Sequence, residues 1–115
     1  MNDDCLFCKI IAGKIPSKKV YDDEKVYAFE DIDPKAPTHV LIIPKAHVPT
    51  ANDLGADHDA LVGAMIRRGA AIARERGYDG SGYRAVINTN AQAGQSVFHI
   101  HLHVLGGRSL AWPPG

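Results

Sequence analysis

Hydrophobic residues recur along the chain at two different spacings, and each spacing predicts a different element. Between residues 57 and 76 apolar side chains return every three or four positions, as Leu61, Met65 and Ile72 do. This is the period of a helix with one buried face. Gly77 follows the pattern directly, as is typical of a helix end. We therefore predict one main helix from about Asp57 to Arg76.

Shorter apolar and β-branched runs, bounded by turn-forming residues, predict strands. We expect extended segments at Val20–Tyr21, Val26–Ile32, Thr38–Ile43, Tyr83–Asn88 and Ser96–Leu105, and a short helix from about Leu6 to Ala12, capped by Asp3 or Asp4 and stopped by Gly13. Short connections favour antiparallel pairing. The expected fold class is α+β, with a five-stranded, mainly antiparallel sheet, one main helix and a short N-terminal helix.

Composition narrows the class of protein. A chain of 115 residues fits one domain. Its formal net charge of zero provides no general attraction for nucleic acid or an anionic membrane, so any bound anion must be held locally. The longest strictly apolar runs, such as Val40–Ile43, fall far short of the roughly 20 residues of a membrane helix. Neutrality is also compatible with self-association.

The two cysteines, Cys5 and Cys8, are too close together to build a disulfide framework. The N-terminus lacks the pattern of a signal peptide, so we expect a cytoplasmic, reducing setting. A Cys-x-x-Cys pair is half of a structural zinc site, and His47 is a candidate third ligand. The alternative is two free thiols, with Cys8 buried as a small apolar residue.

Three histidines, His99, His101 and His103, alternate with apolar residues near the end of the chain. On a strand, this spacing directs all three imidazoles to one face. Such a row can be a solvated surface, a metal site, or a centre for nucleophilic and acid–base catalysis, and spacing alone does not separate the last two. Gly94 and Ser96 precede the row, where backbone amides and a hydroxyl could hold an anion.

The segment Gln95–Arg108 resembles the signature of the histidine-triad, or HIT, family, in which three histidines alternate with apolar residues. Four further blocks resemble the branch of histidine-triad nucleotide-binding proteins: Leu6–Ile11, Phe29–Pro34, Ala36–His39 and Ala111–Gly115. Because the resemblance covers nearly the whole chain, we interpret residues 1–115 as a single HIT domain.

The resemblance implies a role for each matching residue. His101 is the expected nucleophile, His103 contacts a phosphate oxygen, and His99 orients the nucleophile. By the same resemblance, His39 bonds into the triad, Ser96 lies near the leaving nitrogen, and Asp31 binds both ribose hydroxyls. The residues implied to line the phosphate are Asn88, Gly94, Gln95, Ser96 and Val97. Those implied to form the purine pocket are Phe7, Ile10, Phe29, Ile32 and Leu41. Spacing alone would place Phe7, Phe29 and Leu41 in the core.

The activity implied by the resemblance is hydrolysis of purine nucleoside phosphoramidates through a nucleotidyl-histidine, with no cofactor required for catalysis. Alternatives are a dinucleoside polyphosphate hydrolase and a nucleotide-binding module with weak activity. The resemblance also implies His99 as the fourth ligand of a structural zinc.

The resemblance further implies a homodimer in which Trp112 reaches the partner's site. The main helix gives partial support, because Gly63, Gly69 and Ala70 would let a partner helix approach closely.

Overall fold

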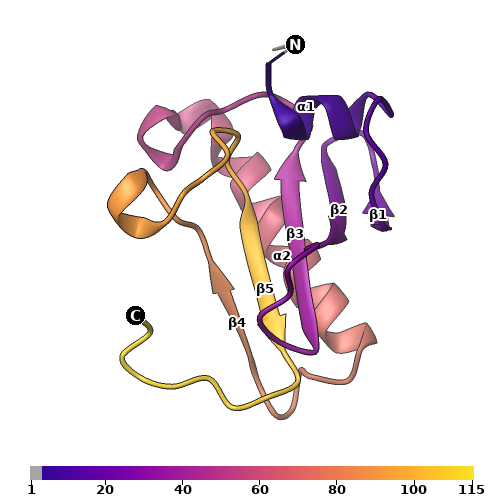
Figure 1. The fold of residues 1–115 in the computed structure, drawn as a ribbon, viewed down its shortest axis with the longest axis vertical. Helices are drawn as coiled ribbons and strands as arrows, with labels where there is room; N and C mark the ends of the chain where they lie inside the picture. Colours follow the sequence, from indigo (N-terminus) through magenta and orange to yellow (C-terminus); the bar gives the residue numbers. More distant parts are fainter. Residues whose placement is uncertain (1–3) are drawn as a thin grey trace.

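The computed structural model describes residues 4–115 and contains one antiparallel five-stranded sheet with the order β1-β2-β3-β5-β4 (Figure 1). The strands are β1 (Lys19–Asp22), β2 (Val26–Glu30), β3 (Thr38–Pro44), β4 (Tyr83–Val86) and β5 (Leu102–Gly106). The α-helices are α1 (Leu6–Ile11) and α2 (Asp59–Glu75), and short 3-10 turns occupy Ala51–Asp53, Ala56–His58 and Ala91–Ala93. The α+β fold class is confirmed.

Alternation along the strands separates two apolar clusters on opposite faces of the sheet. On one face Val40 and Ile42 of β3 pack with Met65 and Ile72 of α2. On the other face Leu41 and Ile43 pack in a cluster with α1. Both faces of β3 are therefore covered, and all of its residues are buried. Figure 1 shows α2 behind the sheet and α1 over one end of it.

The contact between α2 and the sheet depends on a glycine. A Cβ added to Gly69 would lie 3.0 Å from a methyl group of Val104 and 3.4 Å from Ile42, so the missing side chain brings the helix close to β3 and β5. Gly69 is buried against the chain's own sheet, and the expectation that it lets a partner helix approach is wrong. Arg76 adds an ion pair to Glu30 of β2, at 2.8 Å.

The largest departure from the predicted elements concerns the last strand. It was expected from Ser96 to Leu105, but β5 begins only at Leu102. Residues 96–101 instead follow the segment after β3, where the Ile100 amide donates to Val48 O at 2.7 Å. A row of three histidines on one continuous strand is therefore wrong.

Smaller differences concern the ends of helices. The N-cap residue of α1 is Cys5, whose Sγ accepts from the Cys8 amide at 3.3 Å, and not the expected Asp4. Asp3, the other expected cap, lies outside the described residues. Gly13 and Gly77 follow the helices with positive φ, as expected for stop residues. Within residues 4–115 no helix is long and apolar enough to cross a membrane.

Candidate active site

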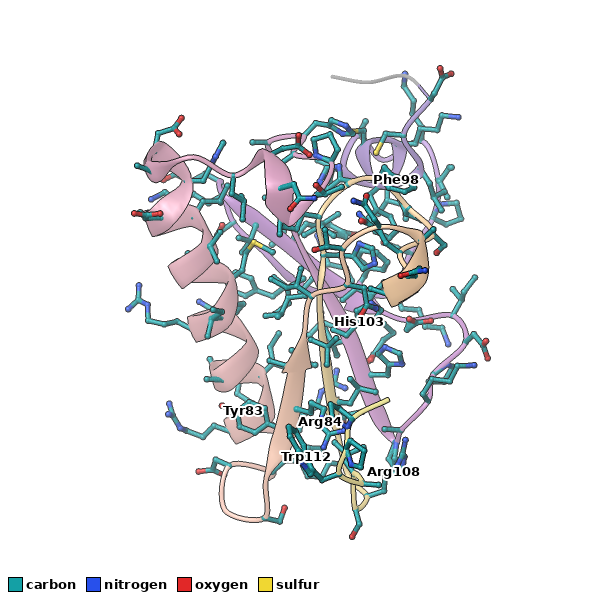
Figure 2. All side chains as sticks on the ribbon, turned by 90° about the vertical axis from the view of Figure 1, so that its left-hand side faces the viewer. Tyr83, Arg84, Phe98, His103, Arg108 and Trp112 are labelled. Atoms are coloured by element: carbon teal, nitrogen blue, oxygen red, sulfur yellow. The ribbon has the colours of Figure 1, made fainter. Side chains whose placement is uncertain are left out.

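The pairing of β3 with β5 brings two of the expected site residues together. Leu41 lies opposite His103 and His39 lies opposite Leu105, so His39 and His103 are diagonal neighbours on one face. His39 Nε2 and His103 Nδ1 are 2.9 Å apart. Figure 2 shows His103 on the face of the sheet that points away from α2.

Hydrogen-bond partners fix which ring nitrogen of His39 and His103 carries the proton. The Lys35 amide donates to His39 Nδ1 at 3.0 Å, so a neutral His39 must hold its proton on Nε2. That Nε2–H then donates to His103 Nδ1. A neutral His103 consequently carries its own proton on Nε2, which is a hydrogen-bond donor for a ligand.

His101 has the opposite arrangement. Its Nδ1 donates to the carbonyl oxygen of His99 at 2.8 Å, which leaves Nε2 with a lone pair. Among residues 4–115, every buried side-chain nitrogen or oxygen has a hydrogen-bond partner. The Nε2 of His101 has no such partner, so this atom must be reachable from solvent. The rings of His101 and His103 lie 4.9 Å apart, centre to centre. The ring of His103, with a proton on Nε2, therefore lies beside the ring of His101, whose Nε2 is unprotonated.

The surroundings keep these rings neutral. Burial lowers the pKa of His101 below its ordinary value. Burial, with the neighbouring His101 and His39, lowers the pKa of His103 to about 4. Phe7 of α1 contributes to this burial, since its ring meets the His101 ring edge-on at 5.1 Å. At neutral pH His101 is therefore available as a nucleophile.

His99 points elsewhere, into a cluster with Cys5, Cys8 and His47. Its Nε2 donates to Pro44 O at 2.7 Å, so Nδ1 faces the cluster. The four donor atoms lie within 4.8 Å of one another. His99 Nδ1 is 3.4 Å from Cys5 Sγ, 3.5 Å from Cys8 Sγ and 3.2 Å from His47 Nδ1. Neighbouring ligands around a tetrahedral zinc are separated by about 3.3–3.8 Å, so the donor set fits that ion.

Asp31, His39 and His103 form a second group of potential metal ligands. Asp31 Oδ2 lies 3.4 Å from His39 Nε2. Because His39 Nδ1 is already an acceptor for Lys35, Nε2 carries a proton and offers no lone pair to a metal ion. Hydrogen bonding therefore accounts for this group better than metal binding does.

Asp31 and His39 line two hollows in the surface, with volumes of about 630 and 320 Å³. The larger is lined also by Ser17, Lys18 and Ile32, and Ile32 is almost fully exposed. The smaller is lined also by His103 and by Asn88. Concave surface with both polar and apolar lining thus extends from the His39–His103 pair along the β2–β3 loop.

Other expected ligand contacts lie apart from these hollows. Phe7, Ile10, Phe29 and Leu41 are all buried in the cluster beside α1. Val97 packs against the same cluster, and Ser96 is exposed in a hollow near His47.

The Gln95 side chain bonds to the backbone of Pro49, Asn90 and Val97, and Gly94 has a positive φ of 92°. Trp112 is 83% exposed and lies beside Arg84, at the end of the sheet away from Phe98 (Figure 2).

Sequence reasoning missed two residues beside the site: Lys35, which contacts His39 through its backbone amide, and Arg108, whose side chain contacts Lys35. Lys35 donates its amide to His39, and Arg108 Nε donates to the Lys35 carbonyl at 2.9 Å. No sequence signal marks the Lys35 contacts, since every residue except proline has the same backbone groups.

Comparison with known proteins places this fold and site in a family. A HIT domain model matches residues 12–110, and the chain belongs to the HIT domain family. It is a HIT family hydrolase. It is 51% identical over 110 residues to the protein named purine nucleoside phosphoramidase of Escherichia coli K12, covering 96% of this chain and 92% of that one.

Solved structures agree with this assignment. A HIT family hydrolase from Legionella pneumophila superposes with a TM-score of 0.95 at 50% identity, covering 96% of this chain and 99% of the other. A histidine triad protein from Clostridium difficile gives a TM-score of 0.92 at 40% identity, with 96% of both chains covered.

Proposed function

We propose that this protein hydrolyses the P–N bond of purine nucleoside 5′-phosphoramidates, with His101 as the nucleophile. The observation that carries the proposal is the bond from His101 Nδ1 to His99 O, which leaves Nε2 unprotonated. The similarity to the Escherichia coli protein named purine nucleoside phosphoramidase supports the substrate class.

The reaction proceeds in two displacements. His101 Nε2 attacks the α-phosphorus in line and forms an N–P bond, while the P–N bond to the leaving amine breaks and the amine takes up a proton from solvent water. Water then attacks the same phosphorus and loses a proton to the solvent, the bond to His101 breaks with its electron pair returning to Nε2, and the nucleoside monophosphate is released. Dividing the reaction in this way replaces one difficult step by two easier ones.

The remaining assignments follow from the same proposal. His103 donates its Nε2 proton to a phosphate oxygen, which is the kind of stabilisation that developing negative charge needs. His39 and His99 hold the two partner rings, and Ser96 serves the leaving nitrogen. Asp31 accepts from both ribose hydroxyls. The phosphate contacts are Asn88, Gly94, Gln95 and Val97, and the base contacts are Phe7, Ile10, Phe29, Ile32 and Leu41.

We further infer a structural zinc held by Cys5, Cys8, His47 and His99. The separations between their donor atoms, and the Pro44 carbonyl that orients His99, support this ligand set. The ion supplies no chemistry to the substrate, because all four of its positions are filled by protein ligands. It holds α1 to the segments that carry His47 and His99.

We also propose that the whole chain, residues 1–115, is a single HIT domain that works in the cytoplasm as a homodimer. Two free thiols are compatible with a reducing compartment. Strand β4 lies at the edge of the sheet, and Ile66 of α2 is 50% exposed. An edge strand and an exposed apolar side chain are suited to pairing with a second copy, whose site Trp112 would reach.

The proposal is tested by incubating the protein with adenosine phosphoramidate and, in parallel, with a dinucleoside polyphosphate. We expect turnover of the phosphoramidate to dominate. Substituting His101→Gly should leave no more than a few per cent of that turnover, with nucleotide binding still measurable. Faster cleavage of the polyphosphate would favour the alternative hydrolase, and full activity in the folded variant would refute the nucleophile.

A further inference from the structure

The loop between β2 and β3 joins the segment after β5 to the site through one residue, Lys35. The Lys35 carbonyl accepts from Arg108 Nε at 2.9 Å, and the Lys35 amide donates to His39 Nδ1 at 3.0 Å. Both backbone groups of this residue are thus engaged, although its own side chain is exposed and pairs with Asp33. Arg108 and His39 therefore hold the same residue of the loop, each through a different backbone group.

The bonds continue inward from His39. Its Nε2 proton has two acceptors within reach, His103 Nδ1 at 2.9 Å and Asp31 Oδ2 at 3.4 Å. While the Lys35 amide occupies Nδ1, a neutral His39 has no choice but to carry its proton on Nε2. If the loop withdraws, His39 is free to move its proton to Nδ1, and His103 then loses the donor that keeps its own proton on Nε2.

Arg108 is placed to prevent that withdrawal. Although it is exposed, it directs Nε to Lys35 O and Nη1 to Ser109 O, at 2.9 Å each. The guanidinium group is planar and its donors have fixed directions, so two carbonyl partners hold the group in one orientation. The side chain therefore fastens the β2–β3 loop to the segment that follows β5.

We propose that Arg108 is a positioning residue, which acts through the Lys35 peptide groups to keep the proton of His103 on Nε2. The chain of bonds runs from Arg108 to Lys35, from Lys35 to His39 and from His39 to His103. The catalytic consequence rests on the proposed function, because it assumes that His103 donates to the substrate's phosphate.

The kinetic test compares Arg108→Ala and Arg108→Lys with Arg67→Ala, which removes an exposed arginine of α2 far along the chain from this loop. For adenosine phosphoramidate we expect kcat to fall about three- to tenfold in Arg108→Ala, the scale of one lost hydrogen bond. KM should stay within about twofold, and Arg67→Ala should match the wild type. Lysine retains one donor, so Arg108→Lys should lie between.

Two spectroscopic readouts separate positioning from a general loss of structure. In wild-type protein, imidazole ¹⁵N shifts should show neutral His39 and His103 with the proton on Nε2. In Arg108→Ala the Lys35 amide should exchange with solvent at least about fivefold faster, and the His39 and His103 shifts should move toward a mixture of both forms.

Unchanged kcat, or a lowered kcat with unchanged histidine shifts, would overturn the proposal. A thermal unfolding curve of each variant identifies any general destabilisation, and the Lys35 and histidine signals remain readable in the folded protein below that transition. If wild-type protein leaves phosphoramidate intact but the ¹⁵N shifts respond to Arg108→Ala as described, the proposed function fails while the bonding chain stands.

Discussion

At the scale of single residues, His103 shows how burial and neighbouring rings change a side chain's chemistry. Its pKa is about 4 in the folded protein, whereas an unperturbed histidine has a pKa of about 6.5. Between these values the unfolded chain binds a proton that the folded protein does not. The free energy of unfolding therefore decreases as pH falls from about 6.5 toward about 4.

This difference predicts that His103→Gln makes stability less dependent on pH. Urea unfolding of wild type and variant at pH 7 and pH 4.5 measures the effect, and the wild type should lose more stability between the two. His99 and His101 are present in both proteins, so the difference between the two reports the loss of His103 and of its interactions with neighbouring rings. Equal losses in the two proteins would mean that the pKa of His103 is not depressed.

The residue scale also shows where prediction from sequence stops. The histidine-rich motif predicted where the reacting groups would lie, but alternation alone predicted three imidazoles in a row. The actual pairing with β3 ends at Ile42 and Leu102, and beyond it the His99 side chain bonds to Pro44 O. This side-chain bond, with the bond from the Ile100 amide to Val48 O, replaces the strand ladder at this point. The contacts of Lys35 could not be predicted, because they depend on where two loops meet in space.

At the scale of elements, patterning was sufficient for most of the fold. The apolar residues of α2 recur at helical spacing because one face of the helix packs on the sheet. The observed bounds of the helix, Asp59–Glu75, fall inside the predicted range. The prediction that Asp4 is the N-cap of α1 was wrong, because the capping rule applied to the sequence favours carboxylates and hydroxyls. Here the thiol of Cys5 occupies that position, and the same sulfur lies in the Cys–His cluster.

The cluster predicts up to one zinc ion per chain in protein purified without a metal-affinity tag. Elemental analysis should show that His47→Ala lowers the zinc content sharply, whereas His58→Ala, a histidine outside the cluster, retains it. Chelation should lower the melting temperature but change kcat little, since the proposed ion would stabilise α1 without touching substrate. Zinc-free protein with two freely titratable thiols would contradict the ligand assignment.

At the scale of the whole molecule, the edge strand β4 and the exposed tail leave one side of the chain suited to assembly. We expect light scattering at micromolar concentration to report about twice the chain mass of 12.4 kDa. Trp112→Ala should then change the preference among leaving amines and leave the mass unchanged. A monomer with full phosphoramidate turnover would refute both the dimer and the cross-subunit role of Trp112.

Strand β3 has a consequence for how this protein can evolve. Its alternate residues face different neighbours: Val40 and Ile42 face α2, whereas His39 and Leu41 face the site and its apolar surroundings. We therefore expect neighbouring positions on one short strand to be under different selection, one for persistence of the molecule in the cell and the next for what it recognises. A lineage can acquire a new substrate through changes at every second position while the intervening positions preserve the molecule that carries them.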